Sequence, residues 1–502
     1  MRNKVLLAVF SLWLYPVANL CEPSPTIAKS LSGKNDYELV FSGAMSFDMP
    51  FGANQNQQSF LFSGAGISKL FQNKPATTFE TFNATNMFVL NRSKFQIIGS
   101  RAIGNDWKVS LVGALNLNQG AGARGQVREA YILVDHPLLG TIAMGNTYGI
   151  EEVTSMGPCD IMQGSGGVAG SMFKFIAPTT GVLTYPSMVG DTATATKIRY
   201  ITARIKEGPL KGIQMATSYT PNAIHRGETS LNTGVSPMRE AFMPFDLNSL
   251  SLGANYLTQW EKGSFGLSFV RIQATTQAEK PLVAQDAKSQ ITDPETGKIV
   301  EAGSPAINGN ELDRCNTQAW QIGGALSLGP ISFAAEYIYN GKSHTLANDF
   351  NPIINKEDGS IAVQGVSPGT INFNGSDQTF EPKEYVAAQA GDGKILTLCI
   401  GYTGLDYGIS LSYLQSSIKT GFLGEGQTTS HKAACKGYVL SAQYNSIPGF
   451  VPYLELGTFK LTNPDWAYAT SMIPSLTQFE FSGIPGKETF TNAAIVGVKI
   501  QF

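Results

Sequence analysis

The sequence repeats one pattern along most of its length: about ten residues that alternate between apolar and polar side chains, followed by a turn. In segment 407–413 the odd-numbered residues are apolar or aromatic, and the even-numbered ones are glycine or serine. Successive side chains of a β-strand point to opposite faces, so each such segment predicts a strand with one apolar face. Segment 396–402 alternates in the same way, and residues 403–406 form a predicted tight turn between the two. The chain is therefore predicted to be all-β.

Sixteen segments follow this pattern, and the connections between them alternate between short and long. The predicted strands are 37–47, 87–99, 107–118, 127–135, 140–146, 195–204, 211–219, 248–258, 264–273, 316–328, 331–340, 394–403, 406–415, 434–444, 450–459 and 491–502. The predicted long loops are 48–86, 147–194, 220–247, 274–315, 341–393, 416–433 and 460–490, and the loop 119–126 is a brief exception. An even strand number, with short turns at one end and long loops at the other, is typical of a transmembrane β-barrel.

Hydropathy excludes a bundle of transmembrane helices. Beyond the N-terminal region no stretch reaches the ~18 consecutive apolar residues that such a helix needs. The mean hydropathy of −0.04 fits barrel strands, which expose only every second residue to lipid, and it also fits a soluble protein. The face opposite the apolar one carries mostly Gly, Ser, Thr, Ala and Gln, which favours a wet interior. We therefore predict a 16-stranded antiparallel transmembrane β-barrel with short periplasmic turns and long extracellular loops.

The first residues have the pattern of a secretory signal. Arg2 and Lys4 precede a short apolar run at 5–15, and small residues follow before Cys21. The run is too short to span a bilayer, which takes ~20 apolar residues. The predicted organisation is a signal peptide at 1–21, an N-terminal periplasmic segment at 22–36 and a barrel domain at 37–502.

The last strand must close the barrel, because every backbone donor and acceptor in hydrocarbon needs a protein partner. Segment 494–502 alternates apolar residues with Lys499 and Gln501 and ends at Phe502. It is predicted to pair with the first strand, 37–47. Since a charge facing lipid near the midplane costs ~2–4 kcal/mol, Lys499 should face the lumen or a rim.

This final strand, ending at Phe502, resembles that of the Gram-negative general porins, as do segments 91–97, 128–133 and 139–145. The resemblance implies a water-filled outer-membrane channel for passive diffusion of small hydrophilic solutes and ions, with no enzymatic activity and no cofactor. It also implies a homotrimer in contact with outer-membrane lipid and lipopolysaccharide. In that family the second loop latches onto a neighbour, whereas here loop 119–126 is short and rich in glycine.

In trimeric porins the third long loop folds into the barrel and narrows the pore, and its acidic residues face a basic wall. The resemblance assigns this role to residues 147–194, with Glu151, Glu152 and Asp160. The alternation of side chains along the predicted strands places six basic residues on the inner face, and these form the predicted basic wall: Arg92, Lys94, Lys108, Arg128, Lys197 and Arg199. Arg128 is placed on the inner face on the assumption that Tyr131 and Leu133 face lipid. Opposed rows of charge would create a transverse field across a narrow, low-dielectric passage. Residues 159–162 depart from the family's acidic and aromatic loop tip.

Other motifs indicate no separate activity. Residues 120–125 match GxGxxG, but a strand rather than a helix is predicted to follow, which argues against a dinucleotide site. The four histidines are scattered without metal-ligand spacing, and a net charge of −2 without a basic run argues against nucleic-acid binding. Cys159, Cys315 and Cys435 fall in or beside predicted loops, so a disulfide and free thiols are both open. The alternative functions are a substrate-specific channel, a surface adhesin and a barrel enzyme.

Overall fold

The protein is described here by a computed structural model. It describes residues 29–32, 37–55, 90–104, 106–116, 126–172, 188, 190–223, 245–277, 290–292, 299–301, 315–343, 353–354, 361–362, 369–373, 376–380, 386–424, 427–462 and 488–501. No helix among these residues is long and apolar enough to cross a membrane.

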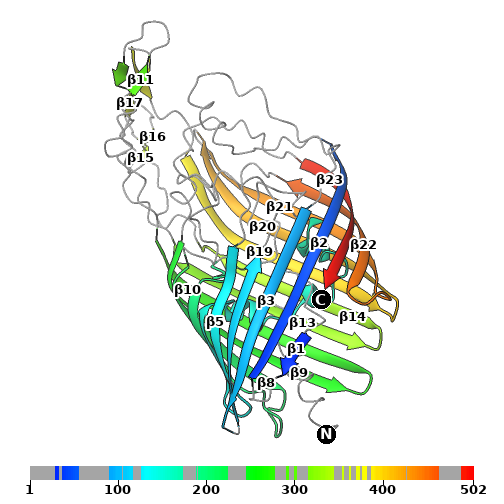
Figure 1. Cartoon of the computed structure of the whole chain (residues 1–502). Helices are drawn as coiled ribbons and strands as arrows, with labels where there is room; N and C mark the ends of the chain where they lie inside the picture. Colours follow the sequence, from blue (N-terminus) through cyan, green and yellow to red (C-terminus); the bar gives the residue numbers. More distant parts are fainter. Residues whose placement is uncertain are drawn as a thin grey trace.

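One antiparallel sheet of 17 strands forms the molecule; the short β1 pairs only with β2, and the other sixteen strands make a closed wall. The strands are tilted around a common axis (Figure 1). The wall strands are β2 (Tyr37–Gln55), β3 (Leu90–Ile103), β4 (Trp107–Asn116), β5 (Gln126–His136), β6 (Gly140–Asn146), β7 (Thr196–Ile201), β8 (Ile213–Asn222), β9 (Phe245–Trp260), β10 (Gly263–Gln277), β13 (Thr317–Leu328), β14 (Ile331–Gly341), β19 (Val386–Thr403), β20 (Tyr407–Gly424), β21 (Gln427–Tyr444), β22 (Phe450–Thr462) and β23 (Glu488–Gln501). The predicted 16-stranded barrel is confirmed.

The first and last wall strands close the barrel. The β2–β23 ladder runs from Ala44 opposite Gln501 to Gln55 opposite Phe490. The other edge of β2 pairs with β3. The predicted pairing of the first and last strands is therefore correct, while Phe502 itself lies outside the described residues. Lys499 faces inward and donates to Gln443 Oε1 at 3.1 Å, as its parity predicted.

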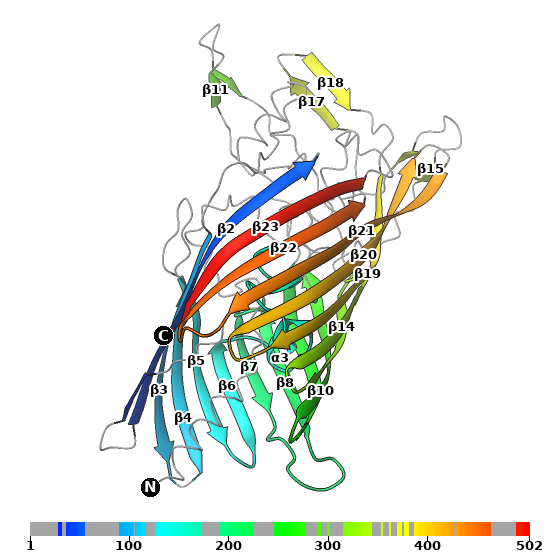
Figure 2. The same cartoon turned by 90° about the vertical axis from the view of Figure 1, so that its right-hand side faces the viewer.

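Short turns join the strands at one end, which is the periplasmic end by the barrel rule, and the small hairpins β11–β12 (290–301) and β17–β18 (369–380) lie beyond the other end (Figure 2). In the Gly329-Pro330 turn, Gly329 has φ +58°, a left-handed conformation that glycine adopts without steric cost. Between β19 and β20, Gly404 N donates to Tyr407 O at 2.9 Å. The two tight turns predicted at these positions are confirmed.

Side chains alternate across the wall as the sequence predicted. On β20, Ile409 and Leu411 are 42% and 47% exposed on the outer face, whereas Ser410 and Ser412 are buried inside. Most of the exposed large hydrophobic side chains lie on such outward positions of the wall strands. This outer apolar surface is what a bilayer requires.

The region 416–433 was predicted as a loop, and this prediction is wrong. β20 continues to Gly424 and β21 begins at Gln427, so the two strands form one long hairpin. The residues of the extension are mostly polar, so the apolar alternation that marks a membrane strand is missing there.

In the long connections 274–315 and 341–393 the structure adds three small hairpins: β11–β12 (Gln290–Thr292, Ile299–Glu301), β15–β16 (Ile353–Ile354, Ile361–Ala362) and β17–β18 (Gly369–Phe373, Ser376–Phe380).

On β5 the inward-facing and outward-facing side chains are exchanged relative to the prediction. Tyr131 and Leu133 are buried on the inner face, in a cluster with Val112 and Ala143, and Ile132 is 41% exposed outside. The β4–β5 ladder shifts register between Ala114 and Leu115, which leaves Arg128 as an extra residue. A bulge of this kind exchanges the two faces of a strand, and an alternation rule cannot detect it.

The N-terminal region contains a strand that was not predicted. β1 (Lys29–Ser32) pairs with β2 from Glu38 to Phe41, on the edge that β23 leaves uncovered.

The four described cysteines form no disulfide. Cys435 is buried within β21 rather than beside a loop.

The lipid-facing surface can be tested at Leu411. Leu411→Lys places a charge on the outer face of β20, four residues from its periplasmic end and near the middle of the ~9–11 residues that cross the hydrocarbon. We expect the free energy of unfolding to fall by about 2–4 kcal/mol. The control is Leu405→Lys in the adjacent turn, where the leucine is 96% exposed and the same charge meets water. Denaturant unfolding in lipid vesicles measures both, and equal effects would contradict the assignment of the outer face.

Candidate functional site

Residues 147–194, here called the inner loop, follow the inside of the barrel wall. Its described part contains α3 (Ile150–Val153) and the short 3-10 helices η1 (Pro158–Asp160) and η2 (Gly167–Ala169). Backbone groups along the loop bond inward-facing side chains of successive strands. These bonds are Ile150 N to Ser218 on β8 (3.4 Å), Met156 N to Ser268 on β10 (2.7 Å), Gln163 N to Ser410 on β20 (2.8 Å) and Gly164 N to Gln443 on β21 (2.9 Å). These bonds attach the loop to wall strands that are far apart in the sequence, from β8 to β21.

Glu455 on β22 is the strongest anchor of the inner loop. Its carboxylate is fully buried and accepts hydrogen bonds from Ser165 N and Gly167 N, both at 3.0 Å, and from the Ser165 hydroxyl. Ser441 Oγ donates to the same carboxylate at 3.0 Å. Gly164 has φ +67°, and a Cβ there would lie 2.6 Å from Glu455 Oε1. Glycine is required at this approach because it alone combines that backbone conformation with the close contact.

Apolar packing supports the same attachment. Val168 and Met172 of the loop are fully buried, in one cluster with inward side chains of the wall such as Ile338, Leu414 and Ile495. The sequence predicted a lumen lined mostly by small and polar residues. The structure adds apolar residues on the inner face where Val168 and Met172 pack against the wall and exclude water.

The returning half of the loop is held by charged residues. Glu151 is buried and accepts from Thr192 N at 3.0 Å and from the Thr192 hydroxyl. Lys197 Nζ on β7 donates to Ala193 O at 2.5 Å, and Arg199 Nη1 donates to Tyr148 O at 2.8 Å. Both basic side chains face inward, as parity predicted. They are buried against the loop.

A second charged group lies on β3 and β5. Lys94 faces inward, as predicted, and its Nζ forms an ion pair with Glu129 Oε1 at 2.8 Å. The same Nζ lies 5.9 Å from the ring centroid of Tyr148, at the start of the inner loop. Lys94 therefore connects the wall of β3 and β5 to the base of the loop.

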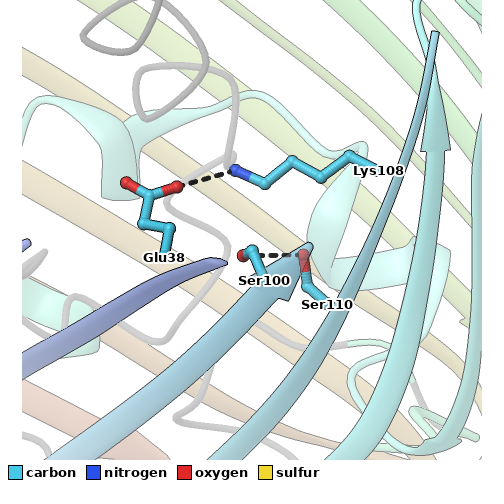
Figure 3. A network of polar contacts seen from close by, with 4 residues as sticks. All are labelled: Glu38, Ser100, Lys108 and Ser110. Carbon is cyan, nitrogen blue, oxygen red and sulfur yellow. Dashed lines mark hydrogen bonds and ion pairs between the residues drawn. The ribbon is translucent and has the colours of Figure 1, made fainter. Parts of the chain in front are cut away.

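The remaining predicted residues are separated. Lys108 faces inward near the periplasmic end, where its Nζ lies 3.1 Å from Glu38 Oε2, above the Ser100–Ser110 hydroxyl pair (Figure 3). On the loop, Asp160 is exposed and Glu152 is half-buried. The side chains of Arg92 and Arg128 lie outside the described part of the chain. The structure thus brings Glu151, Lys197 and Arg199 together at the loop and places Lys108 apart from them.

Several acidic residues of the inner wall were not selected from the sequence. Glu455 holds the loop, Glu129 pairs with Lys94, and Asp48 on β2 accepts from the Ser171 hydroxyl. Glu336 on β14 lies against Gly157 of the loop. A usable signal was present, since each stands at an inward position of an alternating strand, where a buried charge needs a partner.

The loop acid Asp160 has a shifted ionisation. The surrounding barrel atoms limit hydration of its carboxylate and raise its pKa to about 6, and the hydrogen bond from Gly157 N, at 2.9 Å, opposes this effect. The side chain keeps surface accessible to the lumen. Its charge therefore changes in a range that a channel experiment can reach.

Comparison with known families identifies the chain. The model of the family described as Gram-negative porin matches residues 53–463, which is most of the sequence. The chain belongs to the Gram-negative porin family. A search of curated proteins found no significant match.

Solved structures of outer-membrane proteins are similar to this porin at low sequence identity. The outer-membrane channel DcaP of Acinetobacter baumannii is 12% identical, with a TM-score of 0.47 and coverage of 94% of this chain and 99% of that one. OmpT of Vibrio cholerae, folded in vitro, is 9% identical, with a TM-score of 0.47 and coverage of 95% and 100%. OmpF of Salmonella typhi, in complex with daunomycin, is 12% identical, with a TM-score of 0.44 and coverage of 94% and 100%.

Family and fold together establish the general function. The porin is an outer-membrane diffusion channel, because its closed barrel has a lipid-compatible outer surface and the family match covers most of the chain. Membership in this family indicates a channel rather than an enzyme.

The anchor at Glu455 gives a testable expectation. Glu455→Ala leaves the Ser165 and Gly167 amides without their acceptor, and each unsatisfied buried donor costs about 1–3 kcal/mol. We expect a loosened loop, seen as frequent current fluctuations in single-channel recordings. Glu38→Ala, at the periplasmic end, should leave the current steady. A quiet Glu455→Ala channel would contradict the anchoring role.

Proposed function

We propose that small hydrophilic solutes and ions diffuse through a lumen that the inner loop narrows. The observation that carries this proposal is the chain of hydrogen bonds from loop backbone to inward side chains of β8, β10, β20, β21 and β22. A loop held in this way occupies part of the cross-section and cannot swing out with small thermal motions. It therefore acts as the constriction.

The predicted constriction residues divide into two groups in this proposal. Lys94 and Asp160 keep surface accessible to the lumen and meet passing solutes. Glu152 is half-buried and both of its carboxylate oxygens are buried, so its charge acts on solutes only through the electric field. Glu151, Lys197 and Arg199 are buried and hold the loop in position. Arg92 is proposed for the basic wall by sequence alone, and Lys108 for the periplasmic mouth. Arg128 is no longer proposed for the wall, because its inward placement assumed that Tyr131 and Leu133 face lipid, and both face inward. Charges of both signs in a confined passage orient polar solutes and disfavour apolar ones.

We also propose a homotrimer embedded in outer-membrane lipid and lipopolysaccharide. Membership in the porin family supports this assembly. The N-terminal residues 1–21 are proposed as a cleaved signal peptide, which such a destination requires.

Reconstitution tests the channel and its assembly together. Folded protein in planar bilayers should give stepwise, non-saturating conductance, with steps that appear in groups of three. Unheated gels should show a trimer that dissociates on heating. Absence of conductance from folded protein would overturn the proposed diffusion function, and single steps with a monomeric band would overturn the trimer.

The pKa of Asp160 predicts a pH-dependent ion preference. With a pKa of about 6, this carboxylate is roughly 97% ionised at pH 7.5 and roughly 10% ionised at pH 5. Preference for cations, measured as reversal potential in a salt gradient, should therefore decrease as pH falls through 6. Asp160→Asn should show the low-pH preference at both pH values. A variant that keeps the full pH dependence would show that another group is responsible.

A further inference from the structure

An inward side chain of β22 reaches across the last strand of the barrel. Asp48 on β2, Gly497 on β23 and Tyr453 on β22 are successive cross-strand partners, and Asp48 and Tyr453 are buried on the inner face. The three strands lie side by side, with β23 in the middle (Figure 2). The Tyr453 hydroxyl donates to Asp48 Oδ1. A side-chain hydrogen bond therefore spans the strand at which the barrel closes.

Gly497 makes this bond possible because it leaves space on β23. A Cβ at this position would lie 2.7 Å from Tyr453 Cε2 and closer still to Cζ, so any other residue would displace the ring. The φ angle of Gly497 is not among the positive values that favour glycine, and the requirement is therefore for space rather than for an unusual backbone. The Tyr453 ring occupies the place that a side chain of β23 would fill.

The second oxygen of Asp48 binds the inner loop. Asp48 Oδ2 accepts from the Ser171 hydroxyl. Ser171 N donates to Ser165 Oγ at 2.9 Å, and Ser165 N donates to Glu455 at 3.0 Å. Loop segment 165–171 is thus held at one end by Glu455 on β22 and at the other end by Asp48 on β2. The carboxylate of Asp48 connects this segment to Tyr453 across the closing strand.

A carboxylate is a costly side chain at this position. Asp48 has no exposed surface, and neither of the two ion pairs among the described residues involves it. Burying a charge costs free energy unless hydrogen bonds offset the loss of water. Closure of the ladder does not need the charge, since neighbouring inward positions of β2 carry Ala44 and Ser46.

The acid does have an advantage over its amide. A carboxylate presents two acceptor oxygens and no donor, so it accepts from two hydroxyl groups at once, whereas an asparagine side chain presents one acceptor oxygen. Both oxygens of Asp48 are used in this way, one by Tyr453 and one by Ser171. The residue type therefore fits a group that joins the loop to the closing strands.

We propose that Asp48 is a positioning residue of the channel, which sets how far the inner loop extends into the lumen beside the closing strand. Asp48, Tyr453, Gly497 and Ser171 are here called the seam joint. The inference rests on the proposed narrowing of the lumen by the inner loop. Tyr453 fixes one oxygen of Asp48, so the position of the other oxygen, and with it Ser171, depends on Tyr453. Release of the joint lets the loop yield to larger solutes and weakens size selection.

The test measures size selection with neutral sugars, so that changes in the charge of the lumen do not affect the result. Full-length porin is reconstituted in liposomes, and the permeation rate of a tetrasaccharide is divided by that of a monosaccharide. Tyr453→Phe keeps the ring and removes only the hydroxyl, and Ser171→Ala removes the hydroxyl of the loop. Each should raise the ratio about threefold or more, on the scale of one net hydrogen bond, and Asp48→Asn should do so as well.

A double-mutant cycle isolates the role of Asp48. Tyr453→Phe combined with Ser171→Ala should raise the ratio by less than the product of the two single effects, because both substitutions act through the same carboxylate. Independent, multiplicative effects would overturn the proposal, as would an unchanged ratio in the single variants. If Asp48→Asn does not fold, Tyr453→Phe and Ser171→Ala decide the question.

Two glycine substitutions give a matched steric control. Gly497→Ala displaces the Tyr453 ring and should raise the ratio as Tyr453→Phe does. Gly113→Ala on β4 adds the same methyl group where nothing lies within 4 Å, and it should leave the ratio unchanged. Equal ratios in the two alanine variants would contradict the seam joint.

Hydrogen exchange separates this inference from the diffusion function. The backbone amides of segment 165–171 should exchange about threefold or more faster in Tyr453→Phe than in the unmodified porin, because local opening of the loop becomes easier. If the unmodified porin passes no sugar while exchange responds in this way, the diffusion function fails and the seam joint stands. If sugars pass with the same ratio in every variant, the seam joint fails and the diffusion function stands.

Discussion

Every backbone amide and carbonyl inside a bilayer needs a partner within the protein, and the rest of this structure depends on that constraint. It requires the first and last strands to meet, and β2 and β23 do so from Ala44 opposite Gln501 to Gln55 opposite Phe490. Once the sheet is closed, its outer face has to be apolar. The inner face is then free to carry the groups that the function needs, including buried acids such as Glu455.

The inner loop is attached to the inward-facing side chains of the wall. Its backbone amides donate to serine, glutamine and glutamate side chains of the wall, while Val168 and Met172 pack on inward apolar residues. The loop is therefore held like part of a protein core, although it lies within a channel.

The number and pairing of the strands could be predicted from the sequence because alternation and closure are local and topological constraints. The predictions failed where a strand does not follow the apolar–polar alternation that contact with lipid imposes. The hairpin of β20 and β21 extends through a polar segment that has no lipid to face, and the bulge at Arg128 inverts β5. Glu455 was missed because its partners, Ser165 and Gly167, are distant in sequence. Charges such as Lys197 were placed inward correctly, but parity alone does not distinguish a residue that meets solutes from one that holds the loop.

Gln443 joins two parts of the molecule that are far apart in the chain. Its Oε1 accepts from Gly164 N of the inner loop at 2.9 Å and from Lys499 Nζ of the last strand at 3.1 Å. The neighbouring anchors of the loop come from β20, β22 and β2, which are either the last strands to be synthesised or the strand that must wait for them. The loop is made early, but it has no complete seat until the C-terminal strands are present. The full set of anchors that holds the narrowing loop therefore exists only when the C-terminal strands have joined the wall.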